Sequence, residues 1–159
     1  MRSDTEKILL TEEEISNKVV ELGKKISKEY ENKDLLVVGI LKGAIIFMAD
    51  LLRSITIPVE LDFMAVSSYG SSSTSTGIVR IIKDLDHNIE GRNVLLVEDI
   101  VDTGLTLKYI LENLQTREPA SLKVCTLLDK PERRKADVKV DYNGFTIPDE
   151  FVVGYGLDY

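Results

Sequence analysis

Three acidic residues within five positions mark the stretch of this chain that is best suited to chemistry. They are Glu98, Asp99 and Asp102, and the turn Thr103-Gly104-Leu105-Thr106 follows them directly. Carboxylates accept hydrogen bonds from hydroxyls and from metal-bound water, and Mg²⁺ prefers oxygen ligands while it keeps several waters. We therefore predict that Glu98 and Asp99 face sugar hydroxyls or a hydrated divalent cation, and that Asp102 is a candidate base.

The turn after these acids has the character of an anion site. Branched apolar residues at 94–97 precede the acids and are typical of a strand buried on both faces, whereas a helical pattern begins after Gly104. Ligands of open α/β sheets bind beyond the carboxyl ends of the strands, and the first turn of a helix offers backbone N–H groups. This order predicts a phosphate on the amides and hydroxyls of 103–106.

The rest of the chain alternates helical and strand patterns, which predicts an α/β sheet. Thr11 and Glu14 fit a capping box before a helix expected at 12–30. Apolar runs predict strands at 35–41, 58–66, 78–82 and 122–128, strand character over 138–145 and 151–159, and helices at 44–52 and after Thr106.

A segment rich in Ser, Thr and Gly at 67–77 interrupts this pattern. Its composition favours a flexible surface loop, because it buries too little apolar area to order itself. The isolated Tyr69 also fits a lid that closes over a phosphate-bearing substrate. The residues alone leave both interpretations open.

The stretch 98–106 resembles the diphosphate-sugar motif of the type I phosphoribosyltransferases, in the form typical of their hypoxanthine-guanine branch. Four segments between Leu41 and Tyr159 carry this resemblance in the family's order. The resemblance implies an α/β fold of the type I phosphoribosyltransferase kind, a mostly parallel sheet flanked by helices. It also implies one domain over 1–159, with a small hood subdomain formed by the N- and C-terminal segments.

The resemblance assigns further binding residues outside the central motif. It implies that the turn Leu41-Lys42-Gly43 binds diphosphate through its backbone, although Lys42 could simply end a buried strand. Gly43 lacks the Cβ that such a close approach would exclude. The pair Ser68-Tyr69 matches the family's mobile loop, which favours the lid.

Two more segments match the family's purine site. Lys130 could be an ordinary surface lysine, but its counterpart donates to the 6-oxo group of the purine, and the following proline favours a backbone that points it outward. Phe151 could belong to the core, but the resemblance implies that it stacks on the base. It also implies that the Val152 backbone contacts the Watson–Crick edge and that Asp158 helps to hold a second Mg²⁺.

The implied reaction is Mg²⁺-dependent transfer of the 5-phosphoribosyl group from phosphoribosyl diphosphate to a 6-oxopurine base, hypoxanthine or guanine. Asp102 would take the proton from N7 of the purine. Leu105 stands where some relatives carry a lysine, but its amide still serves the phosphate. Resembling enzymes are homodimers or homotetramers and continue to an arginine that reaches the diphosphate. We therefore expect the carboxyl end at Tyr159 to be truncated.

Composition limits the other functions. With 20 basic and 27 acidic residues among 159, the net charge of −7 has the wrong sign for nucleic-acid binding. Cys125 is the sole cysteine and no secretion signal is recognisable at the amino terminus, which favours the cytoplasm. No apolar run approaches the roughly 18 residues of a membrane span. His87 and the basic run 133–135 are expected to be solvated turn residues.

Three alternatives remain. The triplet Asp102-Thr103-Gly104 occurs in aspartic proteases, but those need two such carboxylates on a β-rich scaffold. A receiver-like phosphoacceptor domain would place its acidic pair after the first strand. The third alternative is a catalytically weak nucleotide sensor or RNA-binding regulator with a phosphoribosyltransferase fold, which fold alone does not exclude. Asp102, Lys130 and the acidic net charge argue against it.

Overall fold

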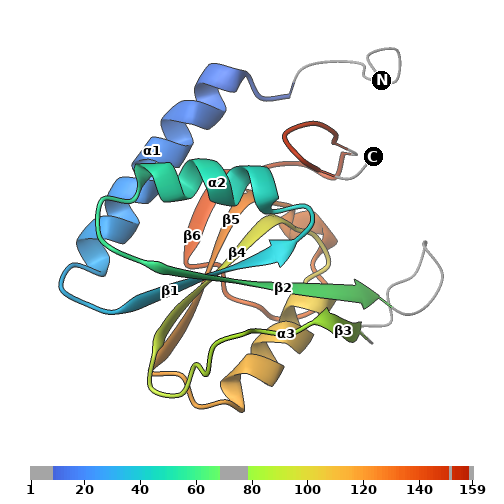
Figure 1. Cartoon of the computed structure of the whole chain (residues 1–159). Helices are drawn as coiled ribbons and strands as arrows, with labels where there is room; N and C mark the ends of the chain where they lie inside the picture. The colour runs from blue at the N-terminus through green and yellow to red at the C-terminus, as the bar shows by residue number, and fades with distance from the viewer. Residues whose placement is uncertain (1–8, 69–78, 151, 158–159) are drawn as a thin grey trace.

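The computed structural model describes residues 9–68, 79–150 and 152–157 (Figure 1). The strands are β1 (Leu35–Leu41), β2 (Glu60–Ser68), β3 (Val79–Lys83), β4 (Asn93–Val101), β5 (Ser121–Asp129) and β6 (Tyr142–Thr146). Within the described residues they form one sheet in the order β3-β2-β1-β4-β5-β6. Strand β3 is antiparallel to β2, and all other neighbours pair in parallel. The predicted mostly parallel α/β sheet is confirmed.

Helices cover both faces of the sheet. Helices α1 (Glu12–Glu29) and α2 (Ile45–Ser54) lie on one face, and α3 (Leu105–Gln115) lies on the other (Figure 1). The predicted capping box starts α1, because the Thr11 hydroxyl accepts from the Glu14 amide at 3.1 Å and the Glu14 carboxylate accepts from the Thr11 amide at 3.0 Å. The sequence pattern therefore located these helices well.

Alternate residues of the central strands enter two separate cores. Leu35 and Val37 pack in the core beneath α1 and α2, whereas Leu36 and Val38 pack in the core that contains α3 residues. All four are fully buried. A strand covered on both faces has no solvent side, which explains why β1 reads as a continuous apolar run.

The strand predictions near the carboxyl end were wrong in part. Among the described residues after 138, a strand forms only at Tyr142–Thr146, and 152–157 form a turn closed by an isolated bridge between Gly154 and Leu157. The backbone has positive φ at Gly154, Tyr155 and Gly156, which interrupts an extended strand. Strand β2 in turn extends to Ser68, further than the apolar pattern indicated.

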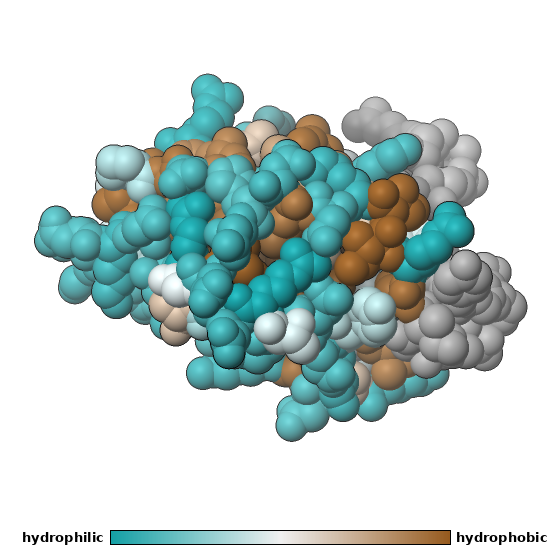
Figure 2. All heavy atoms as spheres, turned by 60° about the horizontal axis from the view of Figure 1, so that its bottom comes forward, coloured by the Kyte–Doolittle hydropathy of each residue, from teal (hydrophilic) through white to brown (hydrophobic). Residues whose placement is uncertain are grey.

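The outer surface is mixed in character. Figure 2 shows a face dominated by hydrophilic side chains, with apolar patches between them. Among the residues described, no helix combines the length and apolar character needed to cross a membrane. Because the apolar patches on this face are scattered, surface hydropathy does not locate the functional site, and the chemistry of the residues has to locate it.

The expectation that His87 is merely a solvated turn residue was wrong. Its Nδ1 lies 2.7 Å from the carboxylate of Asp62, which is buried, and its Nε2 lies 3.2 Å from that of Glu60. The hydrogen bond to Asp62 raises the pKa of His87, and the charges of Asp62 and Glu60 act in the same direction. Burial alone would raise the pKa of Asp62, but hydrogen bonds from His87 and neighbouring amides outweigh it and lower that pKa. His87 thus ties the segment before β4 to β2.

This contact predicts a stability that falls as pH rises. The pKa of His87 is higher in the folded chain than its ordinary 6.5, so the stabilisation is complete below that value and is lost as pH rises through the folded pKa. Thermal unfolding from pH 6 to 8.5 should show a falling midpoint for the wild type and a flatter profile for His87→Gln. His87 is the only histidine in the chain, so parallel profiles would contradict its role.

Candidate active site

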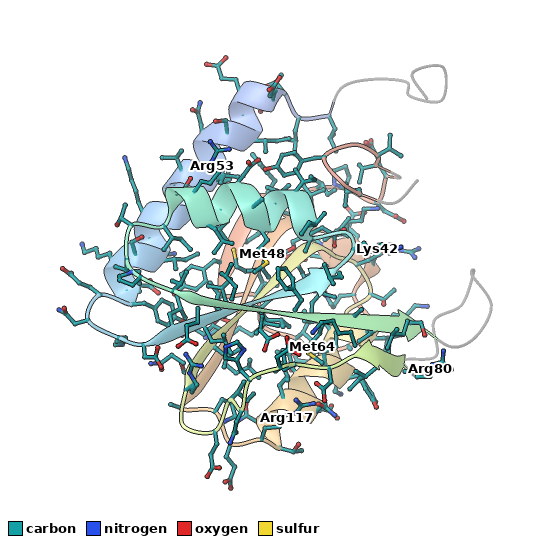
Figure 3. All side chains as sticks on the ribbon, in the orientation of Figure 1. Lys42, Met48, Arg53, Met64, Arg80 and Arg117 are labelled. Atoms are coloured by element: carbon teal, nitrogen blue, oxygen red, sulfur yellow. The ribbon has the colours of Figure 1, made fainter. Side chains whose placement is uncertain are left out.

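Strands β1 and β4 lie side by side at the centre of the sheet, and the chain leaves them toward opposite faces of the sheet. After β1 it continues into α2 on one face, and after β4 it continues into α3 on the other. Such a switch point opens a crevice beyond the carboxyl ends of the two strands. Figure 3 shows Lys42 beyond the end of β1, on this side of the molecule. The peptide bond between Leu41 and Lys42 is cis.

The turn between β4 and α3 forms one wall of this crevice. Gly104 is the N-cap of α3 with φ of +83°, a left-handed conformation that favours glycine. Glycine has no side chain to cap the helix, and the Thr103 hydroxyl accepts a hydrogen bond from the Leu105 amide at 3.3 Å. A hollow of about 180 Å³ lies against this turn and is lined by Glu98, Ile100, Val101, Asp102, Thr103, Gly104, Thr106 and Leu107. The geometry suits an anion at the helix N-terminus.

Glu98 and Asp99 lie where β4 approaches the β1 loop. The carboxyl group of Glu98 is desolvated and hydrogen bonded to Asp99; burial first, and then the Asp99 charge, raise the pKa of Glu98 well above its usual range. A Cβ at Gly43 would overlap the Asp99 carboxylate. The absence of a side chain at Gly43 therefore lets the loop after β1 approach the acids directly.

These two carboxylates are the residues that could contribute to a metal site. No group of three or more His, Cys, Asp and Glu side chains in the described part of the chain is arranged to hold a metal ion. Mg²⁺ commonly takes one or two protein carboxylates, substrate phosphates and water, so a full protein cage is not required. A divalent charge would also offset the repulsion that raises the pKa of Glu98. The residues present fit such an ion.

Asp102 lines the hollow and forms an ion pair with Arg133, which the sequence predicted to be a solvated residue. The Nε of Arg133 donates to the Asp102 carboxylate at 2.9 Å, and Asp149 lies 3.8 Å from the same atom. Arg134 pairs with Asp129 at the end of β5. The prediction of a solvated basic loop at 133–135 holds for the exposure of Arg133 and Lys135 but missed the ion pairs of the two arginines. Nothing in the chain's local pattern indicated the Asp102–Arg133 pair.

The same loop is docked on the phosphate turn through its backbone. The amides of Lys135 and Ala136 both donate to the carbonyl of Thr103, at 2.8 and 3.2 Å. The Lys130 amide donates to the carbonyl of Val101 at 2.9 Å, which places Lys130 beside Asp102 along the sheet edge. Lys130 is only 7% exposed, so it is not the ordinary surface lysine that the sequence also allowed. A buried cation next to a candidate base suits recognition of a polar ligand.

Comparison with known proteins agrees with this arrangement. The family described as the phosphoribosyl transferase domain matches residues 6–159. The chain belongs to the phosphoribosyltransferase family. A hypoxanthine-guanine phosphoribosyltransferase of Bacillus subtilis (strain 168) is 56% identical over 159 residues, covering 100% of this chain and 88% of the relative. One from Mycobacterium avium is 56% identical over 162 residues, covering 98% of this chain and 80% of the relative.

Solved structures of phosphoribosyltransferases share the fold. A crystal structure of a hypoxanthine phosphoribosyltransferase from Staphylococcus aureus superimposes with a TM-score of 0.96 at 55% identity, covering 100% of this chain and 86% of that one. The predicted fold class is therefore confirmed as that of the phosphoribosyltransferases.

Most predicted site residues of this phosphoribosyltransferase meet at one sheet edge. Those brought together are Leu41, Lys42, Gly43, Glu98, Asp99, Asp102, Thr103, Gly104, Leu105, Thr106 and Lys130. Ser68 ends β2, the neighbour of β1. Val152 instead packs at the margin of the core beneath α1 and α2. Tyr69, Phe151 and Asp158 lie outside the described residues.

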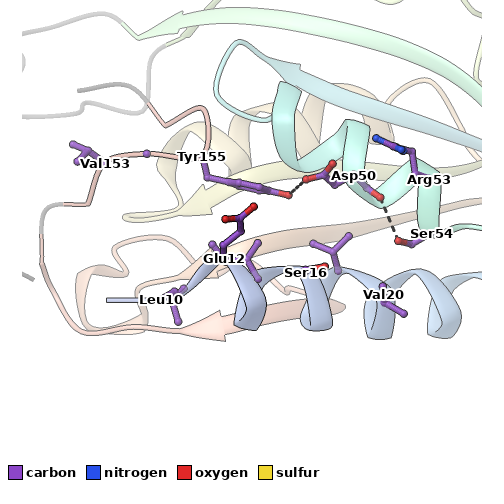
Figure 4. A pocket seen from close by; sticks show the side chains of 12 residues that line it. Leu10, Glu12, Ser16, Val20, Asp50, Arg53, Ser54, Val153 and Tyr155 are labelled. Atoms are coloured by element: carbon purple, nitrogen blue, oxygen red, sulfur yellow. Dashed lines mark hydrogen bonds between the residues drawn. The ribbon is translucent and has the colours of Figure 1, made fainter. Parts of the chain in front are cut away.

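A larger hollow lies away from these acids. It measures about 580 Å³ and is bounded by α1, α2 and the 152–157 turn (Figure 4). Its lining includes Glu12, Asp50, Arg53 and Tyr155 but none of the residues of the phosphate turn. The volume of a hollow alone would therefore point to a region without the acids and the phosphate turn. The candidate site is the smaller hollow, because its lining carries these residues.

Proposed function

We propose that this chain is a hypoxanthine-guanine phosphoribosyltransferase of purine salvage. It would transfer the 5-phosphoribosyl group of phosphoribosyl diphosphate to N9 of hypoxanthine or guanine, giving IMP or GMP and diphosphate. The observation that carries the proposal is the meeting of a helix N-terminus with a glycine N-cap, the candidate base Asp102 and the buried Lys130 at one sheet edge. The similarity to relatives named for this activity agrees with it.

Different residues along the crevice would bind different groups of the substrates. The amides of 103–106 hold the 5-phosphate, because the helix N-terminus favours negative charge. Glu98 and Asp99 accept hydrogen bonds from the ribose hydroxyls. The Lys130 ammonium donates to the 6-oxo group of the base, a contact that the amino group of adenine could not accept.

In the chemical step the bond from ribose C1 to diphosphate breaks ahead of the bond to N9, so positive charge develops on the sugar. Asp102 accepts the proton of N7, which removes positive charge from the purine as the new bond forms.

The proposed reaction also requires Mg²⁺ and residues that bind the diphosphate. When bound, Mg²⁺ neutralises the diphosphate leaving group. Glu98 and Asp99 would hold the ion through its waters, and Asp158 would help to hold a second one. The Leu41–Gly43 backbone would bind the diphosphate, with Ser68 and Tyr69 on a loop that closes over it and excludes water.

The purine site would be completed by Phe151, stacked on the base, and by the Val152 backbone at its Watson–Crick edge. We further propose a single domain with a hood formed by the N- and C-terminal segments, a homodimer or homotetramer, and a cytoplasmic location.

The test is a spectrophotometric assay of the chain with phosphoribosyl diphosphate and each of hypoxanthine, guanine and adenine. We expect nucleotide formation from hypoxanthine and guanine, little from adenine, and none once EDTA removes Mg²⁺. The same assay on a chain extended at its carboxyl end shows how much later residues add. No product from either 6-oxopurine with either chain, or a preference for adenine, would overturn the proposal.

A further inference from the structure

The turn at 152–157 is held in an unusual backbone conformation. Three consecutive residues, Gly154, Tyr155 and Gly156, have positive φ, and the amide of Leu157 donates to the carbonyl of Gly154 at 3.0 Å. Positive φ is uncommon for a residue with a bulky side chain such as Tyr155. Contacts outside the turn must therefore hold Tyr155 in place.

One such contact is a hydrogen bond to helix α2. The phenol of Tyr155 donates to the carboxylate of Asp50, and Figure 4 shows the tyrosine side chain directed at that group. Burial, and then the bond to Asp50, raise the pKa of Tyr155, so the phenol remains a donor. Asp50 also lies on the wall of the large hollow, one turn of helix from Ser54, whose hydroxyl donates to the Asp50 carbonyl. The turn is thus tied to the middle of α2.

The other side of the turn faces the start of the same helix. A Cβ placed on Gly156 would lie 2.8 Å from Cγ1 of Ile46 and 3.5 Å from the carbonyl oxygen of Gly43. Gly43 in turn approaches the Asp99 carboxylate so closely that a Cβ there would overlap it. A continuous chain of contacts therefore runs from Asp50 through the turn to the loop after β1 and on to the acids of β4.

We propose that the Tyr155–Asp50 hydrogen bond is a latch that fixes the 154–157 turn over Gly43 and thereby sets the backbone that receives the diphosphate. Tyr155 and Asp50 are positioning residues, because neither belongs to the crevice that holds the reacting atoms. The inference rests on the proposed function for its kinetic consequence. Its structural consequence, a more mobile Leu41–Gly43 loop without the latch, does not depend on that function.

The latch predicts a selective kinetic effect. Tyr155→Phe keeps the ring and loses the donor, so the KM for phosphoribosyl diphosphate should rise about five- to tenfold, as expected for one hydrogen bond to a charged acceptor. The kcat should stay within about twofold, because the candidate base Asp102 and the acids of β4 lie on other segments and are unchanged. Asp50→Ala, which removes the acceptor, should give a similar rise. If both act through one bond, the double variant should be no worse than either single variant.

Hydrogen exchange gives a second readout. The amides of Ala44 and Ile45 donate to Ile40 and Lys42 within the loop, at 3.3 and 3.1 Å. We expect these amides to exchange faster in Tyr155→Phe than in the wild type, while the β4 amides keep their protection. Tyr109→Phe, which alters an exposed tyrosine on α3, is the matched control and should change neither the KM nor the exchange.

These measurements separate the latch from the proposed function. An inactive wild-type chain contradicts the proposed function, and the exchange of Ala44 and Ile45 then still decides on the latch. Unchanged exchange in Tyr155→Phe would overturn the latch. So would an unchanged KM for phosphoribosyl diphosphate in an active enzyme, a rise confined to the KM for the purine, or multiplied effects in the double variant.

Discussion

Replacing Asp102 by Asn should lower kcat by about 10²- to 10⁴-fold, the contribution usual for a positioned general base. The amide has the same shape and can still accept the hydrogen bond from Arg133, so the loop at 133–136 keeps its place. It cannot take a proton from the purine. The KM values and the affinity for GMP should change little, because the phosphate turn and Lys130 are untouched.

The matched control for this variant is Asp149→Asn. Asp149 lies 3.8 Å from the same arginine but outside the crevice, so its removal should leave kcat within about twofold. Steady-state kinetics and thermal unfolding on both variants measure the difference. Near-normal turnover of Asp102→Asn would refute its role as base. The unfolding midpoint should hardly move in either case, since solvent screens ion pairs this exposed.

Replacing Lys130 by Met should lower kcat/KM for hypoxanthine and guanine by about a hundredfold. The methionine keeps the length and apolar stem of the lysine but removes the donor for the 6-oxo group, and sites built around a buried polar contact discriminate strongly through it. Activity with adenine should fall far less, so the ratio between the two substrate classes shrinks. Folding stability should hold or rise, because burying an ammonium is costly.

The control for Lys130 is Lys135→Met, an exposed lysine on the same loop whose backbone amide is retained. It should keep the wild-type preference for 6-oxopurines. Competition assays with hypoxanthine and adenine measure the ratio directly. Equal losses on both bases in Lys130→Met would mean that the residue supports the fold or the phosphate turn and does not discriminate between bases.

The central site could be predicted from the sequence because its residues follow one another within one short stretch of the chain. A strand buried on both faces, two acids, a third acid and a glycine turn follow one another from Val94 to Thr106, and the parallel sheet puts them at its carboxyl edge. The Leu41–Gly43 loop was assigned to the site through the family resemblance alone, and it lies there because β1 and β4 are neighbours that end at the same edge. Helix α1 followed from its capping box and apolar spacing.

The remaining contacts depend on the packing of distant segments. The pairs of Arg133 with Asp102 and of His87 with Asp62 join residues 31 and 25 positions apart, and in each case a charged residue in a polar turn gave no local sign of its partner. Tyr155 bonds Asp50 across 105 positions, and its turn was predicted as strand because Phe, Val and Tyr favour extended structure. The glycines on either side of Tyr155 were the available signal for a turn.

The most direct test of the phosphate cradle is a crystal structure of the chain with IMP bound. We predict that the 5-phosphate oxygens lie about 2.7–3.2 Å from backbone nitrogens of residues 103–106, with the ribose hydroxyls on Glu98 and Asp99. A nucleotide whose phosphate lies elsewhere, with this turn empty or those two carboxylates directed into the protein interior, would contradict the assignment.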